Sequence, residues 1–249
     1  MKQSTKSRID KLLVERGLVH SRTKAQALIM AGRVLVNGQV VSKAGAEVKL
    51  DSEVSLTEKL PFVSRAGVKL AGFLDEFAID VTGLKVIDVG SSTGGFTDCL
   101  LQRGSAHLWA VDVGKGLLDW GLRNDNRVTV LEGQNIRFLE PDMIAERLDL
   151  AVIDVSFISL KLVLPQVLKF LTDEAMLVVL VKPQFEAGRA DIGKGGIVKD
   201  PEVHSRVLGE IREFAASIGL SVLGEAVSSI KGAKGNVEFG LYLKRGAFA

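Results

Sequence analysis

Three charged residues stand where apolar segments of the sequence end, in positions that favour a role in chemistry. Asp112 ends HLWAVD, Asp154 follows LDLAVI, and Lys182 follows AMLVVLV. Each segment is apolar on both faces, as a buried parallel strand must be, and α/β folds bind ligands at the carboxyl ends of such strands. An aspartate there could equally well cap a following helix. A helix cap does not account for Lys182, so the lysine favours a functional site.

A glycine-rich turn joins a strand pattern to a helix pattern in KVIDVGSSTGGFTDCLL, residues 85–101. Gly90, Gly94 and Gly95 allow the backbone to approach a ligand closely, and Asp112 lies at about the sequence distance at which α/β folds place a ribose-binding acid. The turn lacks both the closely spaced glycines of a dinucleotide site and the lysine of a P-loop. S-adenosylmethionine, a nucleoside cofactor without phosphates, fits better. The alternative is a tight turn without a ligand.

Composition indicates a soluble globular protein, since 47% of the 249 residues are hydrophobic and 25% are charged. The amino-terminal segment MKQSTKSRIDK has no apolar run behind its charges, and the longest apolar run, at 175–181, is too short to span a bilayer. We therefore expect a cytoplasmic protein. A single cysteine, Cys99, and three scattered histidines predict neither an internal disulfide nor a metal site.

Positive charge is concentrated near the amino terminus. Residues 1–60 contain 11 Lys and Arg against 6 Asp and Glu, a balance of +5, whereas the whole chain carries +2 and the remainder therefore −3. This asymmetry indicates that the amino-terminal part binds a polyanion. A solvated basic face explains it equally well.

The first 60 residues have the pattern of a small α+β domain. Apolar spacing predicts a helix from Ser7 to a stop at Gly17 and a second helix at 22–30. Asn37-Gly38 between two β-branched runs predicts a type I′ hairpin, and a further strand is expected near 53–56.

The rest of the chain alternates between strand and helix patterns. Pro61 and the change of pattern predict a linker at 61–66 between domains at 1–60 and 67–249. Beyond the linker we expect a helix at 68–77, strands at 85–89, 107–112, 128–133, 148–154 and 175–182, a helix at 201–218, and strands at 220–229 and 236–244. This order predicts a doubly wound, Rossmann-like α/β sheet with helices on both faces.

The segment 184–199 contains four glycines and few apolar residues. We expect it to be mobile without its substrate and to close over the site when the substrate binds. A rigid loop packed on the sheet edge is the alternative.

Residues 8–41 carry a helix, an S-R-x-x-A helix, a glycine and a V-x-V-N-G hairpin in that order. This segment resembles the S4 RNA-binding domain of ribosomal protein S4 and pseudouridine synthases. The resemblance implies that basic side chains of the second helix and the hairpin face RNA phosphates, namely Arg22, Lys24, Arg33 and Lys43. In the larger domain we expect RNA contacts from Arg65, Arg189 and Lys194.

Five strings in the sequence carry a second resemblance: SRAGVKL, DVGSSTGGFTD, IDVSFISL, KPQFE and GKGG. The larger domain resembles FtsJ-type RNA ribose 2′-O-methyltransferases, and the chain is similar almost end to end to the TlyA/hemolysin A family. The resemblance implies a class I methyltransferase fold, the cofactor S-adenosylmethionine and methylation of cytidine ribose in ribosomal RNA. The Lys-Asp-Lys-Glu catalytic tetrad of that family matches Lys69, Asp154, Lys182 and Glu238.

The cofactor is expected to contact Gly90, Ser91, Gly94, Gly95, Phe96, Asp112 and Asn135. In this arrangement the glycines line its methionine end, Asp112 binds its ribose, and Asn135 lies near the adenine. A turn residue after a strand is an equally good interpretation of Asn135. Trp109 and Trp120 are expected in the core, and an exposed position would make either a candidate for base stacking.

The role of Lys182 has two interpretations. A ribose hydroxyl is a poor nucleophile, so the site must assist the alkoxide that develops during attack. Lys182 acts either as a neutral base, which burial and Lys69 would favour, or as a cation that stabilises the oxyanion, which Asp154 and Glu238 would favour. The sequence leaves both open.

Two functions of other classes are alternatives. A membrane-lytic hemolysin predicts a signal sequence or an amphipathic basic helix, which the sequence lacks. A ribosome assembly factor that binds RNA without catalysis is opposed by the intact tetrad. We expect a monomer that binds ribosomal RNA or a ribosomal subunit, without a membrane or a metal ion, and the sequence does not indicate which subunit.

Overall fold

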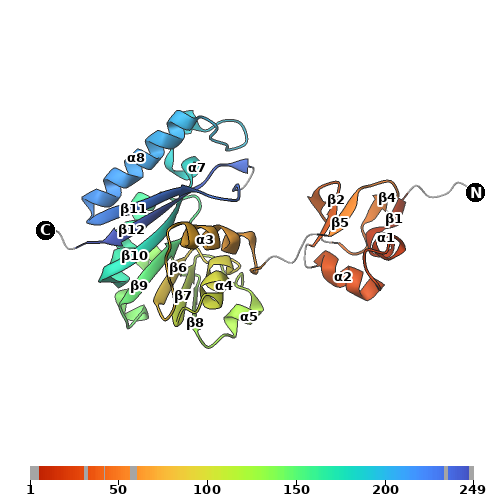
Figure 1. The fold of residues 1–249 in the computed structure, drawn as a ribbon, viewed down its shortest axis with the longest axis horizontal. Helices are drawn as coiled ribbons and strands as arrows, with labels where there is room; N and C mark the ends of the chain where they lie inside the picture. The colour runs from red at the N-terminus through yellow and green to blue at the C-terminus, as the bar shows by residue number, and fades with distance from the viewer. Residues whose placement is uncertain (1–5, 31–32, 42, 57–60, 233–234, 247–249) are drawn as a thin grey trace, which may run out of the picture. The chain divides into compact units, whose positions relative to one another are not determined.

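The computed structural model describes residues 6–246 apart from 31–32, 42, 57–60 and 233–234. The chain forms two compact units, residues 1–60 and 61–249. Figure 1 shows the helices and strands of each unit.

The amino-terminal unit packs two helices against short antiparallel strands. Its elements are β1 (Lys6–Arg8), α1 (Ile9–Glu15), α2 (Arg22–Met30), β2 (Val34–Val36), β3 (Gln39–Val40), β4 (Glu47–Lys49) and β5 (Val54–Leu56). β1 pairs with β4, and β2 pairs with both β3 and β5. Asn37 and Gly38 have φ angles of 50° and 76°, as a type I′ turn requires, so the predicted hairpin is present. The first helix begins at Ile9 rather than Ser7, because Ser7 pairs with Val48 in a strand ladder.

The larger unit is built on one seven-stranded sheet with the order β11-β12-β10-β9-β6-β7-β8. The strands are β6 (Lys85–Val89), β7 (His107–Asp112), β8 (Val128–Glu132), β9 (Leu148–Ile153), β10 (Leu171–Val181), β11 (Leu220–Val227) and β12 (Phe239–Arg245). β6 to β10 are parallel to one another, and β12 runs antiparallel between β10 and β11. The direction in which strands are added reverses between β6 and β9, and doubly wound sheets bind ligands in the crevice at such a point.

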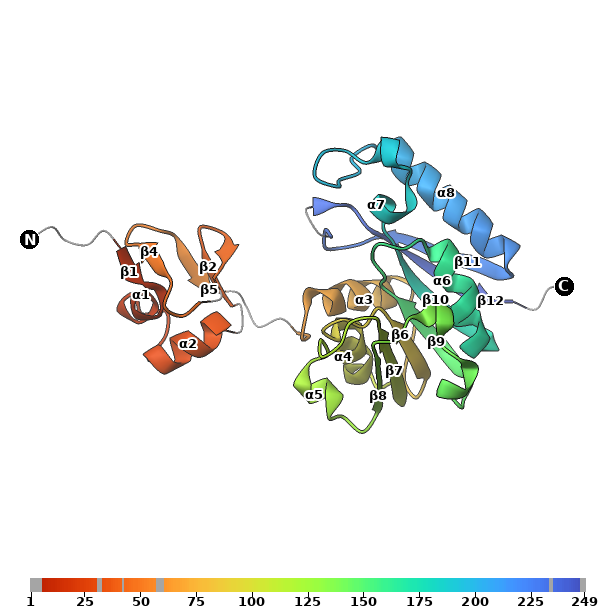
Figure 2. The same ribbon diagram turned by 180° about the vertical axis from the view of Figure 1, so that it is seen from behind.

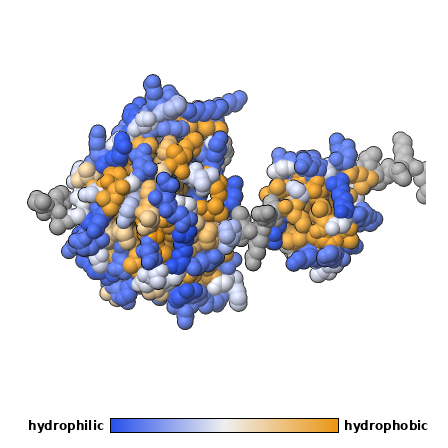
Figure 3. Space-filling model, in the orientation of Figure 1, coloured by the Kyte–Doolittle hydropathy of each residue, from blue (hydrophilic) through white to orange (hydrophobic). Residues whose placement is uncertain are grey.

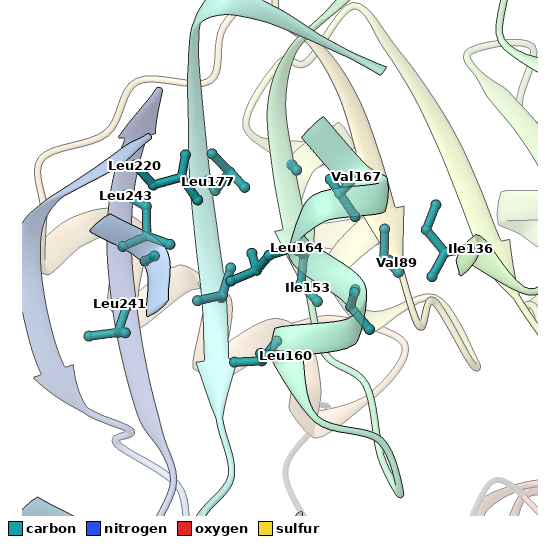
Figure 4. Close-up of a cluster of buried hydrophobic side chains, with 14 of the residues drawn as sticks. Val89, Ile136, Ile153, Leu160, Leu164, Val167, Leu177, Leu220, Leu241 and Leu243 are labelled. Atoms are coloured by element: carbon teal, nitrogen blue, oxygen red, sulfur yellow. The ribbon is translucent and has the colours of Figure 1, made fainter. Parts of the chain in front are cut away.

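Helices cover both faces of this sheet (Figures 1 and 2). The longer ones are α3 (Arg65–Glu76), α4 (Gly95–Gln102), α6 (Leu160–Val167) and α8 (Pro201–Ser217), and the short ones are α5 (Trp120–Arg123) and α7 (Pro183–Glu186). Successive strand residues alternate between two buried clusters: Leu150 packs with α3 and α4, and Ala151 packs with α6 and α8. Figure 4 shows the second cluster, with Leu160 and Leu164 of α6 over the sheet.

The surface of the larger unit mixes side chains of different polarity. On the face seen in Figure 3, hydrophilic and hydrophobic side chains are interspersed. In the part of the chain that the structure describes, no helix is long and apolar enough to cross a membrane.

β10 begins four residues before the expected strand at 175–182, and β12 begins three residues after the expected start at 236. Two further segments also differ from the expectation. α3 begins at Arg65, so it includes the last two residues of the expected linker. The segment 184–199 is folded onto the sheet: it continues from α7 into a 3-10 turn at Arg189–Asp191, and Val198 is buried in a core cluster. The Val198 N–H donates to Asn236 Oδ1 at 3.1 Å. Val198 is the one buried residue of the segment, and half of the residues at 184–199 are exposed, so the predicted movement of the segment stays a prediction.

Candidate active site

Gly90 brings the ends of two neighbouring strands together. It follows β6 with φ of +86°, a conformation that suits glycine. A Cβ atom built on it would lie 2.5 Å from the backbone oxygen of Asp154, which follows β9. A side chain at this position would therefore force the two strand ends apart.

Gly94 and Gly95 are required for packing against other elements. A Cβ atom on Gly94 would lie 2.3 Å from Leu122 Cδ1 of α5, and one on Gly95 would lie 2.2 Å from Ser64 Oγ, just before α3. Gly90 lines the cavity described next, whereas Gly94 and Gly95 do not. The left-handed backbone of Gly94, with φ of +94°, and the close neighbours of both residues account for these two glycines.

A cavity of about 700 Å³ opens at the carboxyl edge of the sheet, at the reversal between β6 and β9. A smaller one of about 190 Å³ shares Gly90, Ser92, Asp154 and Ser156 with it and reaches Lys182. Of the predicted cofactor residues, Gly90, Asp112 and Asn135 line the larger cavity, and Gly90, Ser91 and Phe96 line the smaller one.

Asp112 and Asn135 stand in the wall of the larger cavity and are held by backbone groups. The Asp112 carboxylate accepts hydrogen bonds from the N–H groups of Ser92, at 2.8 Å, and Gly114, at 2.7 Å. A carboxylate has capacity for further donors, such as ribose hydroxyls. Asn135 Oδ1 accepts the Arg137 N–H at 3.1 Å, so this residue also caps a turn, as the alternative interpretation held.

The four predicted catalytic residues form two largely buried ion pairs. Lys182 Nζ lies 2.6 Å from Asp154 Oδ1 and donates to Ser156 Oγ at 3.0 Å. Lys69 Nζ lies 2.5 Å from Glu238 Oε2. Val181 is opposite Phe239 in the β10–β12 ladder, so the adjoining residues Lys182 and Glu238 stand at one edge of the sheet. Each buried charge thus has a partner of opposite sign, as burial of a charge requires.

Asp88, which the sequence analysis missed, is a buried carboxyl beneath the glycine turn. Its side chain is fully buried in β6 and accepts a hydrogen bond from Thr97 Oγ1 at 2.6 Å. Burial raises the pKa of Asp88 to about 7, and the nearby Asp154 and Asp112 add to this effect. The sequence could have indicated this buried carboxyl, because Asp88 stands inside the apolar run KVIDV.

Two phenylalanines at the mouth of the cavity were also missed. Phe157 is 90% exposed and has φ of +63°, a costly backbone conformation for a bulky residue that proteins retain mainly at functional sites. Its ring lies 4.8 Å from that of Phe185, and both residues line the cavity. The sequence could have indicated both phenylalanines, because they stand in IDVSFISL and KPQFE, within three residues of Asp154 and Lys182.

The predicted RNA-binding residues have different surroundings. Arg22 forms an ion pair of 3.0 Å with Asp10, whose fully buried side chain also accepts from Arg8 and Gln26. The Arg8 hydrogen bond, above all, lowers the pKa of Asp10. Part of the Arg22 side chain is therefore committed to the fold. Arg33 is half-buried, whereas the remaining candidates are exposed: Lys24, Lys43, Arg65, Arg189 and Lys194.

The two tryptophans also differ from each other. Trp109 is buried in a core cluster, as expected. Trp120 is 77% exposed, so its expected core position is wrong. The reason is that α5 turns Leu122 toward the core, next to Gly94, and leaves Trp120 on the surface. Among the described residues, no group of His, Cys, Asp and Glu is arranged to hold a metal ion.

Comparison with known protein families matches both units. Residues 7–54 match the S4 domain, and residues 62–245 match the FtsJ-like methyltransferase family. The chain belongs to the FtsJ-like methyltransferase family. The cofactor of this FtsJ-like unit is S-adenosylmethionine, as predicted.

Relatives are similar over almost the whole chain. The Bacillus subtilis protein YqxC is 48% identical over 96% of this chain and 86% of its own length. The 16S/23S rRNA (cytidine-2'-O)-methyltransferase TlyA of Mycobacterium tuberculosis is 44% identical over 96% of this chain and 90% of its own. Hemolysin A of Brachyspira hyodysenteriae is 39% identical over 93% of this chain and 97% of its own. The predicted resemblance to the TlyA/hemolysin A family is therefore confirmed.

Solved structures confirm the predicted fold class. A hemolysin-like protein from Streptococcus thermophilus is 44% identical and has a TM-score of 0.77, covering 97% of this chain and 89% of that one. An S-adenosylmethionine-dependent methyltransferase from Mesorhizobium loti, 13% identical, has a TM-score of 0.55 over 73% of this chain and all of that one. At this identity the second likeness shows the class I methyltransferase fold alone.

The cavity suits this cofactor. Its volume of about 700 Å³ lies within the usual range for small-molecule sites, and Asp112 provides an acceptor for ribose hydroxyls. The turn at Gly90 has no lysine of the P-loop type, which a cofactor without phosphates does not need.

Proposed function

We propose that the protein transfers a methyl group from S-adenosylmethionine to the 2′-hydroxyl of a cytidine in ribosomal RNA. The observation that carries this proposal is the Lys182–Asp154 ion pair, buried at the reversal point of a methyltransferase sheet and lining the cavity. The M. tuberculosis relative is named for cytidine 2′-O-methylation of 16S and 23S rRNA, and a Campylobacter jejuni relative, 34% identical, for that of 23S rRNA.

Within the cavity we propose that Asp112 binds the cofactor ribose and that Gln134 to Ile136, with Asn135, flank the adenine. The methionine end then lies toward Ser91 and Phe96 in the smaller cavity, next to Lys182. Gly90, which lines both cavities, marks the passage between them. Gly94 and Gly95 support this wall from behind by letting α5 and α3 pack closely.

The bound cofactor supplies an electrophilic methyl group, and the chain supplies the groups that act on the ribose. We propose that Lys182 acts as a cation that orients the 2′-hydroxyl and stabilises the developing alkoxide, because it lies 2.6 Å from the Asp154 carboxylate. Asp154 and Ser156 fix the position of its Nζ atom. Lys69 and Glu238, paired at the adjoining strand end, add a second charge pair of fixed geometry.

RNA is bound by exposed basic side chains on both units in this proposal: Lys24, Lys43, Arg65, Arg189 and Lys194, with contributions from Arg22 and Arg33. The exposed ring of Phe157 offers a surface on which the target base stacks beside Lys182. We further propose that the protein acts as a monomer in the cytoplasm, where ribosomal subunits are present.

The test is methyl transfer from labelled S-adenosylmethionine to isolated small and large ribosomal subunits, each assayed separately. Mass spectrometry of the digested RNA should find 2′-O-methylcytidine from at least one subunit. Binding of the subunits without methyl transfer would support the non-catalytic assembly factor instead. A methyl group on a base would contradict the proposed ribose chemistry.

A further inference from the structure

Glu132, the last residue of β8, is bound by an unusual number of donors. Its Oε1 accepts the N–H groups of Leu117, at 2.9 Å, and Leu118, at 3.0 Å. Its Oε2 accepts the N–H of Gly116, at 2.8 Å, and Arg123 Nη2, at 2.7 Å. The Arg123 guanidinium, above all, and these backbone groups lower the pKa of Glu132 to about 2. Three successive N–H groups therefore converge on one permanent negative charge.

The loop that Glu132 binds, residues 113–119, forms one wall of the cavity. Val113 and Leu117 line it next to Asp112. The Asp119 N–H donates to the Thr93 backbone oxygen at 3.2 Å, which ties the end of the loop to the glycine turn.

The same loop has no strand or helix of its own between Asp112 and α5. Its backbone N–H groups therefore have no partners in a strand ladder or a helix of their own, and the acceptors for Gly116, Leu117 and Leu118 come from elsewhere in the chain. Glu132 supplies acceptors for three of them in the middle of the loop.

Glu132 does not itself border the cavity. Its side chain is 11% exposed, and both of its oxygens already accept two hydrogen bonds each. A direct contact with a ligand would have to displace one of these donors. Its effect on the site is therefore exerted through the loop.

We propose that Glu132 is a positioning residue for the cofactor: it holds the 113–119 loop so that Val113 and Leu117 form the wall against the adenosine part of S-adenosylmethionine. This inference rests on the proposed position of the cofactor beside Asp112. Replacement of Glu132 by glutamine would leave one acceptor oxygen and place an NH₂ group against loop N–H groups or Arg123. The loop would then leave its position while the ion pairs at Lys182 and Lys69 stay intact.

The test compares Glu132→Gln with the matched control Glu146→Gln. Glu146 is also a glutamate paired with a basic residue, Lys85, but it pairs at the amino end of β6, away from the cavity. Calorimetry with S-adenosylhomocysteine should show a Kd at least about tenfold higher for Glu132→Gln and an unchanged Kd for Glu146→Gln. KM for S-adenosylmethionine should rise in parallel, whereas kcat at saturating cofactor and the Kd for ribosomal RNA should stay within about twofold.

An unchanged Kd for S-adenosylhomocysteine in folded Glu132→Gln would overturn the proposal, and so would a fall in kcat without a change in KM. A wild-type protein that does not bind S-adenosylhomocysteine would instead contradict the cofactor position on which the proposal rests. If Glu132→Gln does not fold, hydrogen exchange of the wild type decides. The amides of residues 116–118 should be protected in the free protein, and rapid exchange there would contradict the role of Glu132.

Discussion

At the scale of single residues, the burial of Asp88 couples folding to pH. Its pKa is raised to about 7 in the folded protein from an ordinary value of 3.8, so the folded state binds the proton more tightly than the unfolded state. The stability that this proton provides is fully present below pH 3.8 and is lost as the pH rises through about 7.

We predict that Asp88→Asn removes this pH dependence, because the amide stays neutral while its oxygen still accepts from Thr97. Relative to the wild type, the free energy of unfolding of Asp88→Asn should rise between pH 5 and 8.5 by on the order of 3 kcal/mol. Urea unfolding at the two pH values measures this. Asp142→Asn, at an exposed carboxyl, is the control. Equal pH dependence in wild type and Asp88→Asn would contradict the assignment.

The site residues that the sequence predicted are those marked by a local pattern. Asp112, Asp154 and Lys182 follow apolar runs, and the parallel sheet then brings such ends to one edge. The packing role of Gly94 was not predictable, because its neighbour Leu122 reaches it only through the folding of α5. Asp88 was not predicted as a site residue, because it stands inside an apolar run, where burial of a carboxylate is costly and therefore uncommon.

At the scale of elements, the close approach of β6 and β9 depends on Gly90. We predict that Gly90→Ala abolishes cofactor binding, because its Cβ would meet the Asp154 backbone oxygen at 2.5 Å. Gly104→Ala is the matched control. Gly104 also has a positive φ, of +87°, but a Cβ atom built on it would lie 3.6 Å from its nearest neighbour, Thr82. Both variants should lose about 1 kcal/mol of stability or more from the backbone conformation. Calorimetric titration with S-adenosylhomocysteine should detect binding by Gly104→Ala alone.

The succession of strands along the chain and the helices α3 and α8 were predictable because each carries a long apolar pattern, whereas α6 and the order of strands within the sheet were not among the expectations. The pairing of β1 with β4 was not predictable, since both strands are only three residues long and too short to show an alternating pattern. Nor was the folding of segment 184–199, where Asn236, 38 residues further along the chain, fixes Val198. Such contacts join short segments that have no hydrophobic periodicity of their own.

At the scale of the whole molecule, the positive charge of residues 1–60 should provide salt-dependent affinity for RNA. We predict that replacing Lys24 and Lys43 together by glutamine weakens binding of ribosomal RNA and reduces the slope of log K against log salt by about 1.5, if each lysine contacts one phosphate. Filter binding at several salt concentrations gives this slope. Lys169→Gln, an exposed lysine that precedes β10 at the amino edge of the sheet, should leave it unchanged. An unchanged slope in the double variant would remove these lysines from the RNA interface.

The central claim is that Lys182 acts in methyl transfer rather than in binding, and single-turnover kinetics of Lys182→Met tests it most directly. With saturating S-adenosylmethionine and ribosomal subunits, the rate of 2′-O-methylation should fall by at least about 10²-fold, while the Kd values for S-adenosylhomocysteine and RNA stay within about threefold. Lys161→Met, which breaks the exposed ion pair between Lys161 of α6 and Glu210 of α8, should react at the wild-type rate. A wild-type single-turnover rate in Lys182→Met would contradict the account.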